Sequence, residues 1–410
     1  MVSITTIIQN SLLSSLFALH CQSAAIIPNC NQVVPVDFQV SYHDRFDDKD
    51  LFIDNEFNKD EGLAKRDYIK TNLKRRKSYY TTELKIGSQK KKVKVVIDTG
   101  SSDLWVPSSE AKCLDNSKCR SEGVYSVEKS KTAKKLNQPF EIEYPDDTSA
   151  SGVYVQDTVR IGKKTISQQQ FAVVDKSSAK MGALGIGLKS DEETSDNSTY
   201  DNFVFNLKKQ GLINKAGYSL YLPEKEKKSG TILFGGIDED KCSGNLTKFI
   251  VSSDKLAVPL QSVSFENKNY KNDTEAIIDS GSTFSYLPTN IVDGISDLLN
   301  GSYSDKLGVY VVDCKNRRKK SGYITFNFNN ETSILAPLSH FVDCLKKIKS
   351  HVPDHEKNHC GLSILRGDGD GETILGDNFL RSAYVSVDLE DKTVGLAQVK
   401  HSKHHSYKGI

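Results

Sequence analysis

The stretch AIIDSGSTFSYLP, residues 276–288, brings an aspartate out of an apolar run and onto a turn of small side chains. The stretch VVIDTGSSDLWVP, residues 95–107, repeats the same order position by position. In each, the glycine two residues after the aspartate allows a tight turn whose backbone N–H groups point at the carboxylate. The chain therefore presents one motif twice, with Asp98 and Asp279 at equivalent positions.

A second pair of segments supports an internal duplication. ALGIG, residues 183–187, and ILGD, residues 374–377, each place two apolar residues before a glycine. The aspartate and that glycine lie 87 residues apart in the first half (98 to 185) and 97 apart in the second (279 to 376). Two related lobes facing each other about an approximate twofold axis would bring both aspartates to the axis. Because two carboxylates at one site do not both ionise easily, one would hold a proton while the other acts as a base.

Length and composition predict a mainly β protein with two lobes. A chain of 410 residues exceeds what one hydrophobic core accommodates, and 37% hydrophobic residues are enough to fill two. Strand-like runs such as YTTELKIG (80–87) and AYVSVDL (383–389) are typical beyond residue 80. Short helices are expected at 201–211 and 290–301, each closing on a glycine. The near balance of 55 basic and 53 acidic residues argues against nucleic-acid binding.

The start of the chain predicts export followed by proteolytic processing. Residues 1–25 contain an apolar stretch too short to span a bilayer and end in small residues, which indicates a signal peptide. The absence of an early positive charge leaves an uncleaved buried helix as the alternative. Residues 26–66 are acidic and poorly apolar, and we interpret them as a propeptide ending at Lys65 and Arg66. A processing protease that cleaves at dibasic pairs is therefore an expected partner, although the basic cluster at 73–77 offers a second site.

The glycosylation sequons and the cysteines also fit export through the secretory route. Five N-x-Ser/Thr sequons indicate glycosylation. They are Asn197, Asn245, Asn272, Asn300 and Asn330. Eight cysteines without a C-x-x-C pair indicate disulfides rather than metal ligands in an exported chain. Cys21 and Cys30 fall in the leader, which leaves six.

These motifs, with LFGGID and ILGDNFLRSAYVSVDL, resemble the pepsin-type aspartic proteases over about residues 67–400. Within that family the chain is similar to the secreted candidapepsins of Candida-type yeasts. The resemblance implies an all-β, bilobal pepsin-like fold with a few short helices, made as a zymogen and active in acid. The lobe with Asp98 and the flap would span 67–224, and the lobe with Asp279 would span 225–400. Residues 401–410 would be a polar, frayed tail.

The resemblance also assigns the chemistry. Asp98 and Asp279 match the catalytic pair, in which one aspartate removes a proton from water and the other protonates the peptide carbonyl. Cofactors and metals are not part of this mechanism. The residues that match substrate-binding positions are Gly100, Ser101, Tyr144, Pro145, Asp146, Gly281, Ser282, Thr283 and Tyr286.

A hairpin flap is expected at residues 140–159, FEIEYPDDTSASGVYVQDTV. Tyr144 matches the flap tyrosine, and Trp105 matches the tryptophan that hydrogen-bonds to it. Relatives usually have glycine where this chain has Pro145 and Asp147. Because proline has no N–H to offer a bound peptide, we expect somewhat weaker substrate binding.

The family's two disulfides match Cys113 with Cys119 and Cys314 with Cys360. Cys242 and Cys344 are left over and could pair with each other, a question that their spacing does not decide.

An active secreted endopeptidase is the expected function, because both aspartates and both glycines are present. The alternative is a catalytically silent peptide-binding protein on the same fold, which the loss of either aspartate would favour. A surface-anchored protease selective for basic pairs would need a C-terminal anchor, and the end KHSKHHSYKGI (400–410) is polar. We expect polypeptide substrates, no nucleic acid, no membrane anchor, an extracellular location and a monomer.

Overall fold

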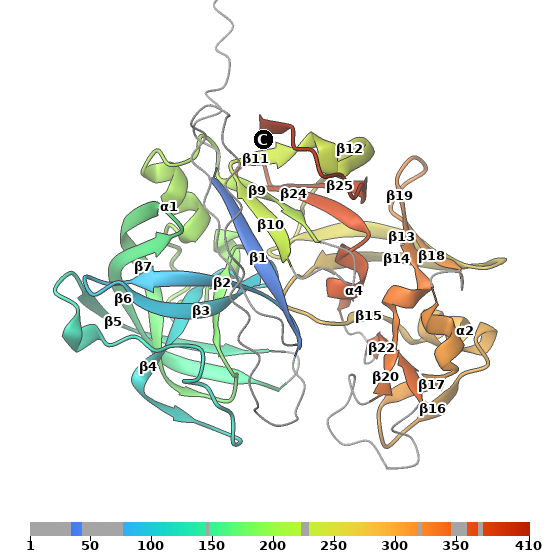
Figure 1. The fold of residues 1–410 in the computed structure, drawn as a ribbon, viewed down its shortest axis with the longest axis horizontal. Helices are drawn as coiled ribbons and strands as arrows, with labels where there is room; N and C mark the ends of the chain where they lie inside the picture. The colour runs from blue at the N-terminus through green and yellow to red at the C-terminus, as the bar shows by residue number, and fades with distance from the viewer. Residues whose placement is uncertain are drawn as a thin grey trace, which may run out of the picture.

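The computed structural model describes residues 34–42, 77–144, 147–222, 229–318, 322–345, 359–367 and 372–410. This part of the chain is built mainly of strands, with three short α-helices (Figure 1). The helices are α1 (Phe203–Lys209), α2 (Thr289–Leu298) and α4 (Asp377–Leu380). The expected signal peptide, the dibasic pair and the boundary between residues 224 and 225 all lie outside the described residues.

The strands follow one another along the chain with short connections. Those of the first half are β1 (Val34–Tyr42), β2 (Lys77–Ile86), β3 (Lys91–Asp98), β4 (Leu104–Cys113), β5 (Lys134–Glu143), β6 (Ser149–Ile161), β7 (Lys164–Ser177), β8 (Gly182–Gly185), β9 (Gly217–Tyr221) and β10 (Ser229–Phe234). Those of the second half are β11 (Gly236–Asp238), β12 (Cys242–Ile250), β13 (Ala257–Phe265), β14 (Lys268–Ile278), β15 (Ser285–Pro288), β16 (Ser302–Ser304), β17 (Val309–Val312), β18 (Tyr323–Asn327), β19 (Ser333–Pro337), β20 (Val342–Cys344), β21 (Cys360–Leu362), β22 (Ile364–Gly367), β23 (Thr373–Leu375), β24 (Ala383–Asp388), β25 (Thr393–Val399) and β26 (Tyr407–Gly409).

One large sheet connects the two halves. Its order is β12-β25-β24-β9-β10-β1-β2-β3-β8-β4-β7-β6-β5, so strands from the end of the chain lie beside strands from its middle and its start. The second half adds a sheet of order β19-β18-β13-β14-β23-β15-β22 and a smaller one of order β16-β17-β21-β20. Figure 1 shows the first-half strands on one side and the second-half sheets on the other. The expected all-β, two-lobed architecture is confirmed.

The internal duplication is visible in the strand pairing. β3 runs parallel to β8, with Asp98 opposite Gly185. In the second half, β14 runs parallel to β23, with Ile278 opposite Leu375. The strand after each aspartate, β4 or β15, then pairs antiparallel with that same neighbour. Each aspartate is therefore held at the end of a strand by an equivalent three-strand unit.

The helices form where the sequence predicts them, but they end differently. The side chain of Asn202 caps α1 by accepting a hydrogen bond from the N–H of Phe205. Gly211 follows α1 in the left-handed conformation (φ 67°), as expected for a glycine that ends a helix. After α2, Asn300 takes that conformation (φ 52°), so the expectation that Gly301 closes this helix is wrong. Asparagine tolerates the left-handed region better than most residues, which explains the difference.

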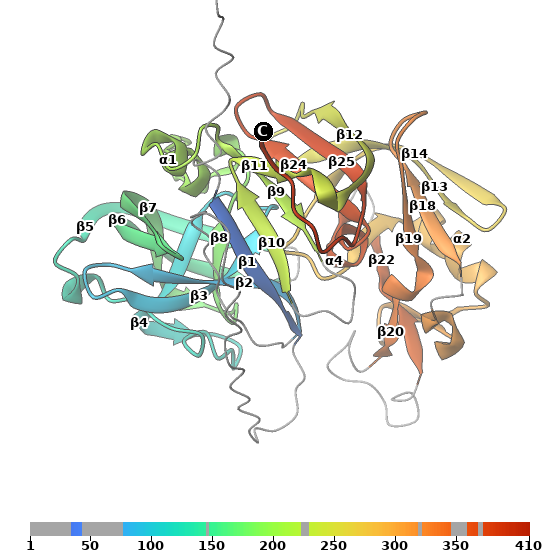
Figure 2. The ribbon, with the colours of Figure 1, turned by 45° about the horizontal axis from the view of Figure 1, so that its top comes forward.

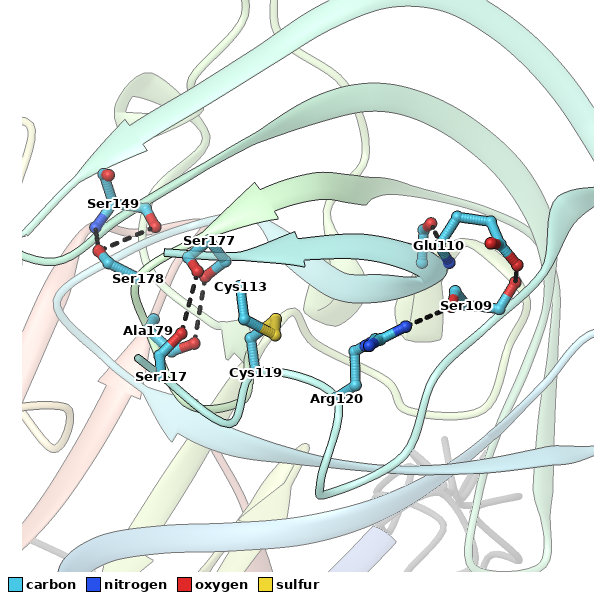
Figure 3. Close-up of a disulfide and its surroundings, with 11 residues drawn as sticks. Ser109, Glu110, Cys113, Ser117, Cys119, Arg120, Ser149, Ser177, Ser178 and Ala179 are labelled. Carbon is cyan, nitrogen blue, oxygen red and sulfur yellow. Dashed lines mark hydrogen bonds between the residues drawn. A yellow bond between two sulfur atoms is a disulfide. The ribbon is translucent and has the colours of Figure 1, made fainter. Parts of the chain in front are cut away.

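The first disulfide fixes a loop at the end of β4. Cys113 is bonded to Cys119, and the Oγ of Ser117, inside the loop, donates a hydrogen bond to the carbonyl of Ser177 on β7 (Figure 3). The second disulfide joins Cys314 to Cys360. Both expected pairings are confirmed.

The C-terminal tail is ordered, so the expectation of a frayed end is wrong. β26 pairs antiparallel with β11, with Lys408 opposite Ile237. Asp238, which is buried, accepts a hydrogen bond from the N–H of Ser406 (2.8 Å) and contacts Nδ1 of His405 (2.7 Å). The tail is polar as expected, but a buried aspartate supplies the partners that hold it in place.

Candidate active site

Asp98 and Asp279 approach each other closely. A Cβ added to Gly281 would lie 2.5 Å from Oδ1 of Asp98, and a Cβ added to Gly100 would lie 2.7 Å from Oδ1 of Asp279. Distances below 3.0 Å are essentially never seen for real Cβ atoms, so only glycine fits at either position. The two glycines are thus required because the opposite carboxylate occupies the space, and not by a left-handed φ.

Each carboxylate receives the same two hydrogen bonds. For Asp98 the donors are the N–H of Gly100 to Oδ1 (2.9 Å) and the Oγ of Ser101 to Oδ2 (2.5 Å). For Asp279 the donors are the N–H of Gly281 to Oδ1 (2.7 Å) and the Oγ of Ser282 to Oδ2 (2.5 Å). The turns therefore orient both carboxylates with their Oδ1 atoms toward the opposite glycine.

Beneath the carboxylates, the hydroxyl groups of Thr99 and Ser280 connect the two halves. The Oγ1 of Thr99 donates to the carbonyl of Ile278 (2.6 Å) and accepts from the N–H of Ser280 (2.9 Å). The Oγ of Ser280 donates to the carbonyl of Ile97 (2.9 Å) and accepts from the N–H of Thr99 (3.2 Å). Both hydroxyls are buried. These four hydrogen bonds set the relative position of residues more than 170 apart in sequence.

The electrostatics favour a shared proton. Burial, and then the charge of Asp279, raises the pKa of Asp98 well above its usual range. The hydrogen bonds from Ser101 and Gly100 act in the opposite direction. Because the two carboxylates interact strongly, the pair titrates as a unit and retains one proton over a wide range of pH.

The flap contact is formed as expected. The Nε1 of Trp105, which is buried, donates to the Oη of Tyr144 (2.8 Å). The N–H of Asp147 donates to the carbonyl of Tyr144 (3.0 Å), and Asp147 has φ 64°. Glycine adopts this left-handed conformation at less cost than an aspartate does. The expected contributions of Pro145 and Asp146 lie outside the described residues.

The two cleft residues expected from the second lobe follow Asp279 closely in sequence. Thr283 and Tyr286 are both half-buried, and Tyr286 pairs with Ile374 of β23 and Leu365 of β22. They remain predicted cleft residues.

Sequence reasoning missed a buried carboxylate next to the first turn. Asp103, inside the DLWVP segment, accepts hydrogen bonds from the Oη of Tyr154 (2.7 Å), the Oη of Tyr200 (2.6 Å) and the N–H of Glu193 (2.8 Å). Burial raises its pKa. The only signal was an aspartate between a serine pair and an apolar run, which does not reveal partners about 50 to 100 residues away.

A second carboxyl group lies close to this one. Glu192 accepts a hydrogen bond from the N–H of Tyr200 (2.7 Å), while its Oε1 is buried with no hydrogen-bond partner among the described residues. Burial raises the pKa of Glu192 to about 8. Burial therefore raises the pKa of both acidic groups, while the hydrogen bonds that Asp103 accepts act in the opposite direction.

The sequons differ in accessibility. Asn197, Asn245, Asn300 and Asn330 are exposed. Asn272 is buried, and its Nδ2 donates to the carbonyl of Leu260 (2.8 Å) and to the Oγ1 of Thr274 (3.0 Å).

The described residues carry neither a metal-binding cluster nor a helix suited to span a membrane. They contain no cluster of histidine, cysteine and acidic side chains able to hold a metal ion. No helix in this part of the chain has the length and apolar character needed to cross a membrane.

Comparison with known proteins identifies the family. The model of the eukaryotic aspartyl proteases matches residues 79–399. The chain belongs to the eukaryotic aspartyl proteases. This aspartyl protease is similar to candidapepsin-4 of Candida albicans strain WO-1, at 39% identity over 85% of this chain and 83% of the relative. It is also similar to secreted aspartic protease 3 of Candida albicans, at 40% identity over 83% of this chain and 84% of the relative. The resemblance to candidapepsins is confirmed, and the chain is an aspartic endopeptidase of that type.

Proposed function

We propose that Asp98 and Asp279 are the catalytic pair of a secreted, acid-active endopeptidase. The observation that carries this proposal is the close approach of the two carboxylates, which leaves room only for glycine at positions 100 and 281. The raised pKa of Asp98 supports a pair that holds one proton and one negative charge.

The geometry suits general acid–base activation of water. A water molecule between the carboxylates gives a proton to the ionised aspartate as its oxygen attacks the carbonyl carbon of the substrate. The protonated aspartate donates its proton to the carbonyl oxygen, which gives a tetrahedral intermediate. As this intermediate collapses, the amine leaves with the proton that the first aspartate took from the water, and a hydroxyl of the intermediate returns a proton to the other aspartate. Ser101 and Ser282 keep the outer oxygens oriented through both steps.

The substrate would lie between the carboxylates and the flap. The hydrogen bond from Trp105 fixes the ring of Tyr144 at the base of the flap turn. Excluding bulk water at this point would strengthen the interaction of the pair with the developing charge. The substrates are polypeptides, as the family implies.

Asp98→Asn and Asp279→Asn test the assignment. Each variant of the purified mature protein should lose hydrolysis of an unstructured protein substrate at pH 4 and keep its circular dichroism spectrum. Asp305→Asn, an exposed aspartate in the second half, is the matched control and should retain full activity. Appreciable turnover by either of the first two variants would contradict the shared mechanism. Peptide binding by the mature protein without cleavage at any acidic pH would favour a silent binding protein instead.

We also propose that the chain is secreted as a zymogen that is cut after Arg66. The relatives are named as secreted proteases, and the exposed sequons fit the secretory route. β1, which belongs to the proposed propeptide, pairs with β10 and β2, and its residues Val34 and Val36 are buried. This segment would therefore be part of the folded precursor rather than a loose leader. N-terminal sequencing of the secreted protein should show a start at Asp67, and a start at Arg76 or Lys77 would instead identify the downstream basic cluster as the processing site.

A further inference from the structure

One cysteine outside the disulfides lies directly opposite a cysteine inside one. β20 pairs antiparallel with β21, and in this register Cys344 is the cross-strand partner of Cys360. Cys360 is bonded to Cys314, whereas Cys344 is in no disulfide. Three cysteines of the second half are therefore brought to one place by the fold.

The hydrogen bonds around this pair define its geometry. The N–H of Ser363 donates to the carbonyl of Phe341 (2.7 Å), and the N–H of Leu345 donates to that of His359 (3.0 Å). Hydrogen-bonded and non-hydrogen-bonded pairs alternate in an antiparallel ladder, so Cys344 and Cys360 form a non-hydrogen-bonded pair.

Such pairs place their side chains on the same face at the closest cross-strand spacing. Their Cα atoms are about 4.5 Å apart, which falls within the range of about 4.4–6.8 Å that disulfides span. The register of β20 and β21 thus already meets the backbone requirement for a bond between Cys344 and Cys360.

The third cysteine is presented from the adjoining helical turn. Residues 314–317 form a short 3-10 helix that carries both Cys314 and Arg317. The Nη1 of Arg317 donates to the Sγ of Cys344 (3.1 Å), so this turn contacts both the thiol and the disulfide.

We propose that Cys344 is a thiol–disulfide exchange site whose substrate is the Cys314–Cys360 disulfide. The thiolate of Cys344 attacks the Sγ of Cys360, a Cys344–Cys360 bond forms, the Cys314–Cys360 bond breaks, and Cys314 leaves as a thiolate that takes up a proton. The step conserves electrons, so it requires no oxidant or reductant. The second lobe thereby has two interchangeable disulfide pairings with one free thiol in each.

Chain length gives the exchange a role in folding. The Cys344–Cys360 pairing spans 16 residues (344 to 360), and the Cys314–Cys360 pairing spans 46. Loop-closure entropy makes the shorter pairing about fivefold easier to form in the unfolded chain. The shorter disulfide would form first, and the folded register would keep Cys344 beside Cys360 for transfer to Cys314.

The second cysteine outside the disulfides provides an internal control. Cys242 begins β12, and β12 and β20 lie well apart in both views (Figures 1 and 2). The alternative that Cys242 pairs with Cys344 is not what the structure shows. Cys242→Ser should therefore leave the exchange unchanged.

The experiment measures which cysteine is free. The purified secreted protein is held at pH 8, where ordinary thiols ionise appreciably, or at pH 4, where they do not. It is then quenched in acidic guanidinium, alkylated with N-ethylmaleimide and mapped by mass spectrometry. We expect label on both Cys314 and Cys344 at pH 8, in the wild type and in Cys242→Ser, and no label on Cys314 in Cys344→Ser at either pH. Label confined to Cys242 and Cys344 after prolonged incubation at pH 8 would overturn the proposal.

A second variant tests the geometry independently of the exchange rate. Cys314→Ser, made through the secretory route, should contain a Cys344–Cys360 disulfide, with Cys242 alone reacting with N-ethylmaleimide in the folded region. If Cys344 and Cys360 both react in a folded Cys314→Ser protein, the two strands do not hold them at bonding distance and the proposal is wrong. Because the wild-type measurement stands alone, a Cys314→Ser variant that fails to fold still leaves the proposal open to refutation.

Discussion

Thr99→Val should destabilise the protein far more than its near-identical shape suggests. Valine keeps the volume of threonine but removes the hydroxyl that joins the carbonyl of Ile278 to the N–H of Ser280. Both groups are buried, and a buried group that loses its partner costs about 1–3 kcal/mol. With two such groups, we expect the free energy of unfolding to fall by about 2–6 kcal/mol.

The sequence offers a convenient probe for this measurement. Trp105 is the single tryptophan of the chain, and it is buried in the lobe that contains Thr99. Equilibrium urea unfolding followed by tryptophan fluorescence therefore reports that lobe, while far-ultraviolet circular dichroism reports both. Because the hydroxyls also align the two aspartates, kcat should fall about tenfold for each ~1.4 kcal/mol of lost transition-state stabilisation.

Two control variants separate the hydroxyl from other effects. Thr99→Ser retains the oxygen and should stay close to the wild type in stability and in kcat. Thr325→Val, at a half-buried threonine on β18, should change stability by less than about 0.5 kcal/mol. If Thr99→Val unfolds within about 0.5 kcal/mol of the wild type, the hydrogen bonds that link the halves contribute little and the reasoning fails.

Three further outcomes are expected. The pKa of Glu192 is raised to about 8 in the folded protein, whereas the unfolded chain releases this proton near pH 4. Because the folded protein therefore binds more protons between these values, its free energy of unfolding should decline from about pH 4 to about pH 8. Calorimetry at pH 4, 6 and 8 should show a smaller decline in Tm for Glu192→Gln, and an identical decline would exclude this group as a cause. Tyr144→Phe removes the hydroxyl that accepts the hydrogen bond from Trp105. It should lower kcat/KM several-fold, corresponding to about 1 kcal/mol, without changing Tm by more than a few degrees. Unchanged steady-state kinetics would contradict the role of this contact. Glycopeptide mass spectrometry should find glycans at exposed sequons such as Asn245 and none at the buried Asn272. A glycan on Asn272 in the folded secreted protein would show that the β13–β14 pairing around it is incorrect.

The sequence predicted the features that depend on a few adjacent residues. An apolar strand, an aspartate and a glycine two positions later are enough to specify each turn, and repetition of the motif implied that Asp98 and Asp279 meet. The contacts of Asp103 could not be predicted, because its partners lie in other strands and loops and nothing in the local pattern points to them. The docking of the tail was missed for the same reason, since its polar residues are indistinguishable from a solvated end until Asp238 is located beside them.

The place of β1 in the large sheet imposes an order on synthesis and folding. β1 leaves the ribosome before β2 and β10, with which it pairs, and Gln39 of β1 lies opposite Ser229 of β10. These two residues are 190 positions apart (39 to 229), which at about 5–20 residues per second corresponds to roughly 10–40 s of translation. During that interval one edge of β1 has no β10 to pair with, and an uncovered strand edge is a site for aggregation. β1 can therefore pair along both edges only after residue 229 has emerged, so a pause in translation before that residue would prolong the vulnerable state.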